Sequence, residues 1–385
     1  ASADFISRLP PEIALYLLGF ADDATLRAAA QVCRYWRQLA NDNTLWRRLY
    51  CRHADWGTSW LKGGHAVTPT VPLSAPTHYR RLYHTRQLLE KRWLRGALDT
   101  QVLLGHTDSV YCVQFDGEYI FTGSRDRTIR QWDARTLQCV RKVEAHAASV
   151  LCLRRHGDHL ITGSSDCTAR IWRLPTFTQE MRLVGHSAGV LDVCLDDQRV
   201  VTCSKDATVR VWDRSTGQCL RVLTGHRGPV NAVQMSNGLI VSASGDATLR
   251  VWDAQTFACV RVITGHTRGL ACVRFDGRYI VSGSNDRTIR VWDARTGECL
   301  QTLEGHLDLV RTIWFNERWI VSGSYDMTVK VWDRQTGLQT LDLQNGHSGW
   351  IFDVQFDHSK IISVGQDRKI VVWDFGRGLD LTYVC

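Results

Sequence analysis

Two patterns of apolar and polar positions divide the chain. Between residues 100 and 375, apolar and polar residues alternate in short runs that stop at Asp, as in Thr288-Ile289-Arg290-Val291-Trp292. Alternation with a period of two is typical of β-strands. Within residues 7–50, apolar positions are instead three or four residues apart, as at Leu26, Ala29 and Val32, which is typical of amphipathic helices. The sequence therefore predicts a small helical module followed by a large all-β region.

The β region repeats itself every 40 or 41 residues. Each repeat has a His, usually after Gly, then an Asp 20 residues later and a Trp six residues after the Asp. The His are His106, His146, His186, His226, His266, His306 and His347; the Asp are Asp126, Asp166, Asp206, Asp246, Asp286, Asp326 and Asp367; the Trp are Trp132, Trp172, Trp212, Trp252, Trp292, Trp332 and Trp373. Each period holds about four short strands with turn residues between them. A repeat of this length indicates a solenoid, a propeller or an array.

A hydroxyl residue precedes each of these Asp by four positions. The set is Thr122, Thr162, Thr202, Ser242, Ser282, Ser322 and Ser363. One Ser–His–Asp set would suggest nucleophilic catalysis, but an enzyme needs only one, and this set occurs seven times, each with its own Trp. Buried polar groups need partners, so we interpret the sets as structural networks. We predict no catalytic residue, no metal and no cofactor, because seven His spread over seven repeats cannot gather on one ion.

Composition and charge narrow the function classes. The chain has 385 residues, 44% of them apolar and 22% charged, which excludes a disordered or collagen-like chain and suggests two or three domains. Residues 1–98 hold 14 Lys and Arg against 7 Asp and Glu, whereas residues 99–385 hold 33 against 32. General attraction to nucleic acid is therefore a weak explanation for the β region, and any anion binding there must be local.

The thirteen cysteines indicate the redox state of the compartment in which the protein is found. Several recur at multiples of 40 residues, as Cys139, Cys219, Cys259 and Cys299 do, and no CxxC pair occurs. We interpret them as reduced, small core residues, which fits a reducing compartment. The chain begins without the order of a signal peptide and has no apolar run long enough to span a membrane. We therefore expect a cytoplasmic or nuclear protein with no membrane partner.

The spaced His, Asp and Trp residues resemble the WD-repeat family, whose fold is a β-propeller of four-stranded blades. Seven repeats imply seven blades. Residues 102–104 precede the first repeat, and the last repeat ends near Trp373 after only three clear strands. We therefore expect residues 102–104 to form the outer strand of the last blade, which would close the ring.

The helical module carries a second resemblance. We predict helices over 11–18, 24–32, 34–40 and 44–50. The string Leu9-Pro10-Pro11-Glu12, then Val32-Cys33-Arg34-Tyr35-Trp36 and Leu45-Trp46, resembles the F-box, a short motif that docks on the adaptor of the SCF ubiquitin ligase. The fold class is thus a seven-bladed WD-repeat β-propeller preceded by a small all-α F-box and a helical linker. The domains are expected at 5–52, 53–98 and 99–385, the second comprising a loop over 56–75 and a spacer helix over 77–94.

The F-box resemblance implies partners and a contact surface. It implies binding to the SCF adaptor and, through it, to cullin, while the propeller binds the substrate. The implied adaptor contacts are Leu9, Pro10, Ile13, Leu17, Leu26, Val32, Trp36, Leu45 and Trp46.

In propellers of this type, three positions per blade line one face: three and five residues after the His, and one residue before the Asp. These 21 positions contain three cations and no acid. Scattered cations among hydroxyl donors, with apolar residues between them, suit a short anionic peptide better than a long polyanion. We therefore expect phosphorylated substrate proteins, and not nucleic acid, as partners.

Strings such as Gly123-Ser124-Arg125-Asp126, Arg268-Gly269-Leu270-Ala271-Cys272 and Leu309-Val310-Arg311 resemble the beta-transducin-repeat-containing F-box proteins, which read doubly phosphorylated peptides. The resemblance implies a first phosphate site of Tyr111, Arg125, Ser149, Ser165 and Lys205. It implies that Arg311 and Tyr325 hold an Asp of the peptide. It implies a second phosphate site of Arg268, the Gly269 N–H and Asn285, above a floor of Leu151, Leu191, Asn231 and Ala271.

The sequence departs from that family at two places. Asn285 stands where the family has Ser, and Trp350 where it has Arg, so the second phosphate site fits less well. The leading hypothesis is a non-catalytic substrate receptor of an SCF-type ubiquitin ligase. The alternative is a WD-repeat scaffold that binds unmodified peptide or RNA without ligase function.

Overall fold

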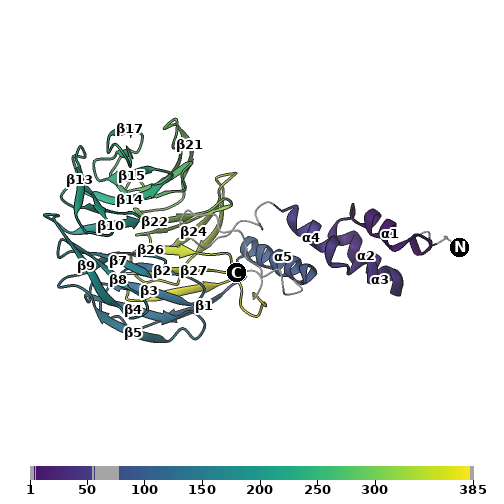
Figure 1. Cartoon of the computed structure of the whole chain (residues 1–385). Coiled ribbons are helices and arrows are strands. Elements are labelled where there is room, and N and C mark those ends of the chain that lie inside the picture. Colours follow the sequence, from purple (N-terminus) through teal and green to yellow (C-terminus); the bar gives the residue numbers. More distant parts are fainter. Residues whose placement is uncertain (1–3, 5, 54–55, 57–77, 382–385) are drawn as a thin grey trace. The chain divides into compact units, whose positions relative to one another are not determined.

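The computed structural model describes residues 4, 6–53, 56 and 78–381 (Figure 1). The chain forms two compact units, one of residues 1–98 with Phe375–Cys385, the other Asp99–Asp374. The carboxy-terminal segment from Phe375 thus groups with the helices. Of the predicted loop over 56–75, only Trp56 is among the described residues, and residue 77 is not among them.

Among its described residues, the helical unit contains a short 3-10 helix and five α-helices, close to those predicted. Their bounds are η1 (Ile6–Arg8), α1 (Pro11–Leu18), α2 (Asp23–Val32), α3 (Arg34–Ala40), α4 (Asn43–Cys51) and α5 (Tyr79–Arg95). Side-chain caps explain two starts, since Asp22 accepts the Thr25 N–H and Asp42 accepts the Thr44 N–H, both at 2.8 Å. α5 ends at Gly96, whose φ of 65° is a left-handed conformation that favours glycine.

The core of this unit joins α5 to the smaller helices. Leu26, Leu45 and Trp46 are buried together with Tyr83 of α5. The carboxy-terminal segment packs on the same helix: the Arg92 side chain donates to the Phe375 and Arg377 carbonyls, both at 2.8 Å, and the Trp93 and Phe375 rings stack at 4.1 Å. The basic residue Arg92 of α5 is thus used within the unit. No helix among the described residues is long and apolar enough to cross a membrane.

The larger unit consists of seven four-stranded antiparallel sheets that follow one another around a ring (Figure 1). Blade 1 is β2 (Val110–Phe115), β3 (Tyr119–Ser124), β4 (Thr128–Asp133) and β5 (Cys139–Glu144); blade 2 is β6 (Val150–His156), β7 (His159–Ser164), β8 (Thr168–Arg173) and β9 (Thr178–Val184); blade 3 is β10 (Val190–Leu195), β11 (Arg199–Ser204), β12 (Val209–Asp213) and β13 (Cys219–Leu223). Blade 4 is β14 (Val230–Ser236), β15 (Leu239–Ser244), β16 (Leu249–Asp253) and β17 (Cys259–Ile263); blade 5 is β18 (Leu270–Phe275), β19 (Tyr279–Ser284), β20 (Ile289–Asp293) and β21 (Cys299–Leu303); blade 6 is β22 (Val310–Phe315), β23 (Trp319–Ser324), β24 (Val329–Asp333) and β25 (Gln339–Leu343).

The seventh blade joins the two ends of the ring, as predicted. It consists of β26 (Ile351–Phe356), β27 (Lys360–Gly365), β28 (Ile370–Asp374) and the early strand β1 (Asp99–Leu103). β1 pairs with β28 from Asp99 opposite Asp374 to Leu103 opposite Ile370. Because this pairing supplies the missing outer strand, the last blade has no unpaired edge at β28.

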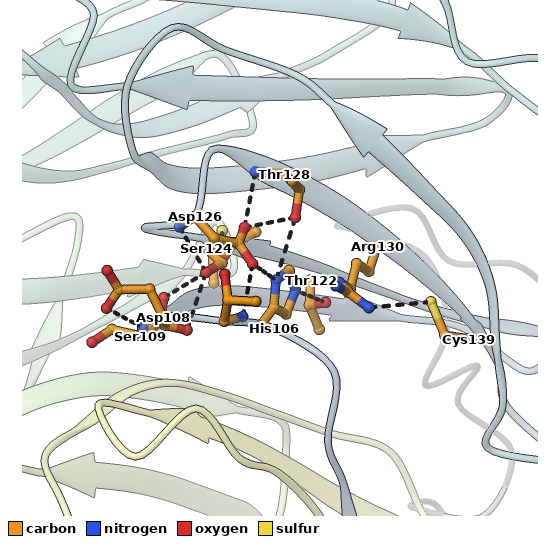
Figure 2. Close-up of polar contacts among 12 residues, drawn as sticks. His106, Asp108, Ser109, Thr122, Ser124, Asp126, Thr128, Arg130 and Cys139 are labelled. Carbon is orange, nitrogen blue, oxygen red and sulfur yellow. Dashed lines mark hydrogen bonds and ion pairs between the residues drawn. The ribbon is translucent and has the colours of Figure 1, made fainter.

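The predicted His–Asp–hydroxyl–Trp network is present in every blade. The His Nδ1 lies 2.7–3.0 Å from the Asp carboxylate and the His Nε2 lies 2.8–2.9 Å from the hydroxyl. The Trp indole N–H donates to the same hydroxyl at 2.8–3.0 Å. Figure 2 shows the blade 1 network, with His106 between Asp126 and Thr122. The network thus fastens the turn before each inner strand, which carries the His, to the second and third strands of the same blade.

Protonation in the network follows from these contacts. A carboxylate only accepts hydrogen bonds, so each Nδ1 carries a proton and a neutral ring then accepts the hydroxyl proton at Nε2. Burial lowers the pKa of His146, and hydrogen bonds from Thr168 and His146 lower the pKa of Asp166 to about 2 although burial opposes them. Each of the seven hydroxyl residues is fully buried, so no substrate can reach it and the sets are structural.

The cysteine prediction was wrong for the outer strands. Every cysteine among the described residues is a free thiol, but Cys139, Cys219, Cys259 and Cys299 are exposed. Each of these four begins the outermost strand of its blade, which has solvent on its free side. The buried cysteines belong to strands nearer the ring centre, such as Cys112 and Cys272.

Candidate functional site on one face of the propeller

One backbone hydrogen bond fixes the same turn in all seven blades. The residue before the network Asp donates its N–H to the carbonyl of the residue three positions after the network His, at 2.8–3.0 Å. The donor–acceptor pairs are Arg125–Ser109, Ser165–Ser149, Lys205–Gly189, Gly245–Pro229, Asn285–Gly269, Tyr325–Leu309 and Gln366–Trp350. Two of the three predicted face positions are therefore held together by main-chain atoms, which leaves their side chains available.

A β-bulge in every inner strand positions the remaining face residue, which lies five residues after the network His. The pairing of β2 with β3 shifts between Val110 and Cys112, and the other six blades shift at the equivalent step. A bulge re-aims the extra residue's side chain. The extra residues are Tyr111, Leu151, Leu191, Asn231, Ala271, Arg311 and Phe352, and all of them line the cavity at the ring centre.

Neighbouring blades are also tied at this cavity. The Asn231 side-chain amide donates to the Leu270 carbonyl at 2.6 Å, and the Arg311 guanidinium donates to the Ala271 carbonyl at 3.2 Å. These contacts hold Asn231 and Arg311 in place while leaving further donors on both side chains. No cluster of potential metal ligands occurs among the residues that the structure describes.

The remaining predicted face residues lie in turns of blades 1, 2, 3, 5 and 6. Arg125, Ser165, Lys205, Arg268 and Asn285 are exposed, whereas Ser149, Gly269 and Tyr325 are half-buried. The structure thus places Arg125, Lys205 and several neutral donors at equivalent turn positions, and Arg311 in the cavity itself. The predicted division into two phosphate sites stays a prediction.

An acidic residue next to Arg125 was missed by the sequence reasoning. The Arg125 Nε lies 3.6 Å from an Asp108 carboxylate oxygen, and both side chains are well exposed. Asp108 follows the network His by two residues, a position outside the three that were inspected. Burial raises the pKa of Tyr111, while the charges of Arg125 and Arg311 act to lower it. Arg125 therefore interacts with the exposed Asp108 carboxylate and also acts on Tyr111 in the cavity.

The helical unit has a separate exposed apolar surface. Ile13, Leu17 and Val32 are 48%, 41% and 58% exposed, and Leu9, Pro10 and Trp36 are at least partly exposed. Leu26, Leu45 and Trp46, predicted as adaptor contacts, are at most 5% exposed. That part of the prediction is corrected, because these three side chains form the core that holds the helices together. Tyr16 and Phe20, which the sequence reasoning missed, are 60% and 65% exposed and extend the surface.

Both units match known protein families. A family described as "WD domain, G-beta repeat" matches residues 99–133, 137–173, 177–213, 217–253, 257–293, 297–333 and 338–374, more than half of the chain. The chain belongs to the WD-repeat family. A family described as "F-box-like" matches residues 6–52 of this WD-repeat protein.

Curated relatives of this WD-repeat protein match it over about a third of its length. They include a "Probable E3 ubiquitin ligase complex SCF subunit sconB" of Arthroderma benhamiae, 33% identical over 161 residues (36% of this chain and 24% of the relative). An F-box protein of Saccharomyces cerevisiae is 31% identical over 157 residues (36% and 24%). "F-box/WD repeat-containing protein 7" of Drosophila melanogaster is 37% identical over 145 residues (36% and 11%). The matched segment is thus a quarter or less of each of these three relatives.

Two glycines of this WD-repeat protein keep blades 4 and 5 close at the face. A Cβ added to Gly269 would lie 2.8 Å from the Gly245 carbonyl oxygen and 3.0 Å from its Cα. Such distances are too short for any side chain, so Gly269 is required by packing. Its carbonyl already accepts from the Asn285 N–H at 2.9 Å and the Ser284 hydroxyl at 3.1 Å.

Four aromatic rings of the WD-repeat face form a chain across blades 6, 7 and 1. Tyr325 and Trp350 stack in parallel with ring centres 4.5 Å apart and 6° between their planes. Tyr325 meets Phe352 edge-on at 6.0 Å, and Phe352 meets Tyr111 at 4.8 Å. The sequence reasoning named Tyr111, Tyr325 and Trp350 separately and did not anticipate that their rings would form one chain with Phe352.

Proposed function

We propose that this chain is the substrate-recognition subunit of an SCF-type E3 ubiquitin ligase and that its propeller face binds a phosphorylated peptide. The observation that carries the proposal is that Arg311 lines the central cavity, while Arg125 and Lys205 occupy the equivalent hydrogen-bonded turn position of blades 1 and 3, with hydroxyl and amide donors in other blades. The co-occurrence of F-box-like and WD-repeat segments supports it, and so do the SCF subunit names of relatives. The chain acts as a receptor and performs no chemistry itself.

In this proposal the first phosphate is bound by residues of blades 1 to 3. The exposed Arg125 and Lys205 supply charge, and Tyr111, Ser149 and Ser165 supply hydroxyl donors. Arg311 and Tyr325 bind an acidic residue of the peptide. A second phosphate is bound less well by Arg268, the Gly269 N–H and Asn285, above the floor of Leu151, Leu191, Asn231 and Ala271.

The decisive experiment compares a serine-phosphorylated peptide with its unphosphorylated form. Hydrogen bonds to charged groups contribute about 1.5–3 kcal/mol each, so loss of two such contacts weakens binding roughly 100-fold or more. Arg125→Ala should reduce phosphopeptide affinity about tenfold or more, measured by fluorescence anisotropy. Arg135→Ala is the matched control, because Arg135 is exposed in the turn after β4, at the opposite end of that strand from Arg125. Equal binding of the two peptides by the wild type would reject the proposal and favour a scaffold for unmodified ligands.

The adaptor is proposed to bind the exposed apolar surface of α1 and α2, and cullin is reached through it. This surface consists of Ile13, Tyr16, Leu17, Phe20 and Val32. Leu17→Asp should abolish capture of the SCF adaptor in a pull-down, whereas Leu88→Asp, at a similarly exposed leucine of α5, should not. Capture that survives Leu17→Asp would show that the adaptor binds elsewhere.

A further inference from the structure

We propose that the ring chain Trp350–Tyr325–Phe352–Tyr111 is a subsite for an apolar side chain of the bound peptide, with Trp350 as the specificity-determining residue. This inference rests on the proposed function, since it adds a second recognition element to the same phosphopeptide. It differs from the implied second phosphate site, which relies on charge.

The propeller does not need a tryptophan at position 350. The equivalent residues of the other six blades are Ser109, Ser149, Gly189, Pro229, Gly269 and Leu309. The turn uses the main chain of Trp350, whose carbonyl accepts the Gln366 N–H at 2.8 Å. A side chain that the fold can replace with hydrogen is free to serve binding.

Trp350 is also unusually exposed. Its 45% exposure contrasts with 1–5% for the eight tryptophans that are buried in the described part of the propeller. One face of its indole stacks on Tyr325, which orients the ring and restricts its rotamers before any ligand arrives. A rigid aromatic side chain presents a large apolar contact area at low entropic cost. Burial of a peptide side chain against it removes apolar area from water.

The charges beside the rings decide which peptides fit. Tyr111 and Arg311 line the same cavity, and the charges of Arg311, Arg125 and Asp108 all act on the pKa of Tyr111 at one end of the ring chain. Aromatic clusters can also bind methylated ammonium groups, but the two guanidinium groups outnumber the Asp108 carboxylate, and the excess positive charge repels a cationic ligand. The same guanidinium groups attract a phosphate. The geometry thus fits a peptide with a phosphate at Arg125 and an apolar residue within a few positions of it, because extended chain advances about 3.3–3.6 Å per residue.

The test measures binding of a phosphoserine peptide panel by fluorescence anisotropy. Each residue within three positions of the phosphoserine is replaced in turn by Leu, Ser, Asp or trimethyl-lysine. We expect one position at which Leu binds about tenfold more tightly than Ser in the wild type. In Trp350→Ser, which copies blades 1 and 2, that preference should fall below about twofold while the preference for phosphate persists.

Leu338→Ser is the control, since Leu338 is 68% exposed in the turn after β24, whereas Tyr325 lies before the start of that strand. It should keep the Leu preference. An unchanged Leu preference in Trp350→Ser, no Leu preference at any position, or a preference for Asp or trimethyl-lysine at the responsive position would each overturn the inference. Failure of the proposed function is distinguishable, because the wild type would then bind phosphorylated and unphosphorylated peptides with equal affinity.

Discussion

At the residue scale, one buried hydroxyl per blade carries two hydrogen bonds. Ser242 lies 2.8 Å from the His226 Nε2 and accepts the Trp252 indole N–H at 2.9 Å. Removal of the hydroxyl leaves both nitrogen atoms buried without a partner. An unsatisfied buried polar group costs about 1–3 kcal/mol, more than a typical hydrogen bond gains.

We predict that Ser242→Ala lowers the free energy of unfolding by about 2 kcal/mol or more. Urea unfolding at pH 7.5 measures this change. Ser187→Ala is the matched control, because Ser187 is exposed and reaches Asp206 through its backbone N–H. A similar loss for both variants would mean that the buried network adds nothing specific.

Thiol reactivity distinguishes two groups of cysteines. Burial raises the pKa of Cys272 to about 12, and only the thiolate form reacts readily. We predict that iodoacetamide at pH 8 labels Cys139 and Cys259 in the folded protein but not Cys112 or Cys272, as mass spectrometry of the peptides would show. Equal labelling of buried and exposed thiols would contradict the described packing.

At the element scale, β1 closes the ring through a strand that is distant in sequence from its partner β28. Leu103 at the end of β1 is 4% exposed and packs with Val110 and Ile370, whereas the next residue, Leu104, is 69% exposed. The two leucines are adjacent in the chain and have the same side chain, but they differ in burial.

We predict that Leu103→Ala destabilises the propeller by about 2–4 kcal/mol, because it leaves a cavity where two ends of the ring meet. Leu104→Ala should change stability by less than about 0.5 kcal/mol. Thermal unfolding of both variants tests the difference. A small effect of Leu103→Ala would show that the closing strand contributes little to the fold.

The elements were largely predictable, because their periods are strong. The repeat of His, Asp and Trp marks the same points in every blade, and the unmatched strand before His106 indicated the closure. Burial at the sheet edge was less predictable. Cys139 and Cys112 recur with the same period, yet one begins an outer strand and the other lies near the centre. A period gives a residue's place in the repeat and leaves its distance from the ring axis undetermined.

At the scale of the whole molecule, acid should weaken the fold. Burial lowers the pKa of His106, His146, His186, His226 and His266. Below the ordinary His value near 6.5, the unfolded chain binds protons that the native His sites still refuse, so stability falls. The native pKa of about 2 at Asp166 and Asp206 adds a second loss as pH falls from the ordinary Asp value near 3.9 towards 2.

We therefore predict that the melting temperature falls steadily from pH 7.5 to pH 4.5, measured by differential scanning calorimetry at constant ionic strength. A melting temperature that rises over this interval would contradict neutral His residues in the networks.

The candidate site was predictable in its positions and less so in its contacts. The resemblance to WD-repeat propellers implied the face positions, and the bulge and the turn recur at them in every blade. The Arg125–Asp108 pair and the Tyr325–Trp350 stack depend on side-chain directions between neighbouring turns and blades. Such contacts between positions with unrelated spacings leave no signal in a single sequence.

The turn that holds the face has a consequence for how such proteins diversify. Its hydrogen bond joins main-chain atoms in every blade, from Arg125 and Ser109 to Gln366 and Trp350. Side chains of many kinds, from hydrogen to indole, already occupy these places without altering the bond. Ligand preference can thus change by single substitutions at these places, except at Gly269, where packing excludes a side chain, and this surface is a natural starting point for redirecting the protein to a new target.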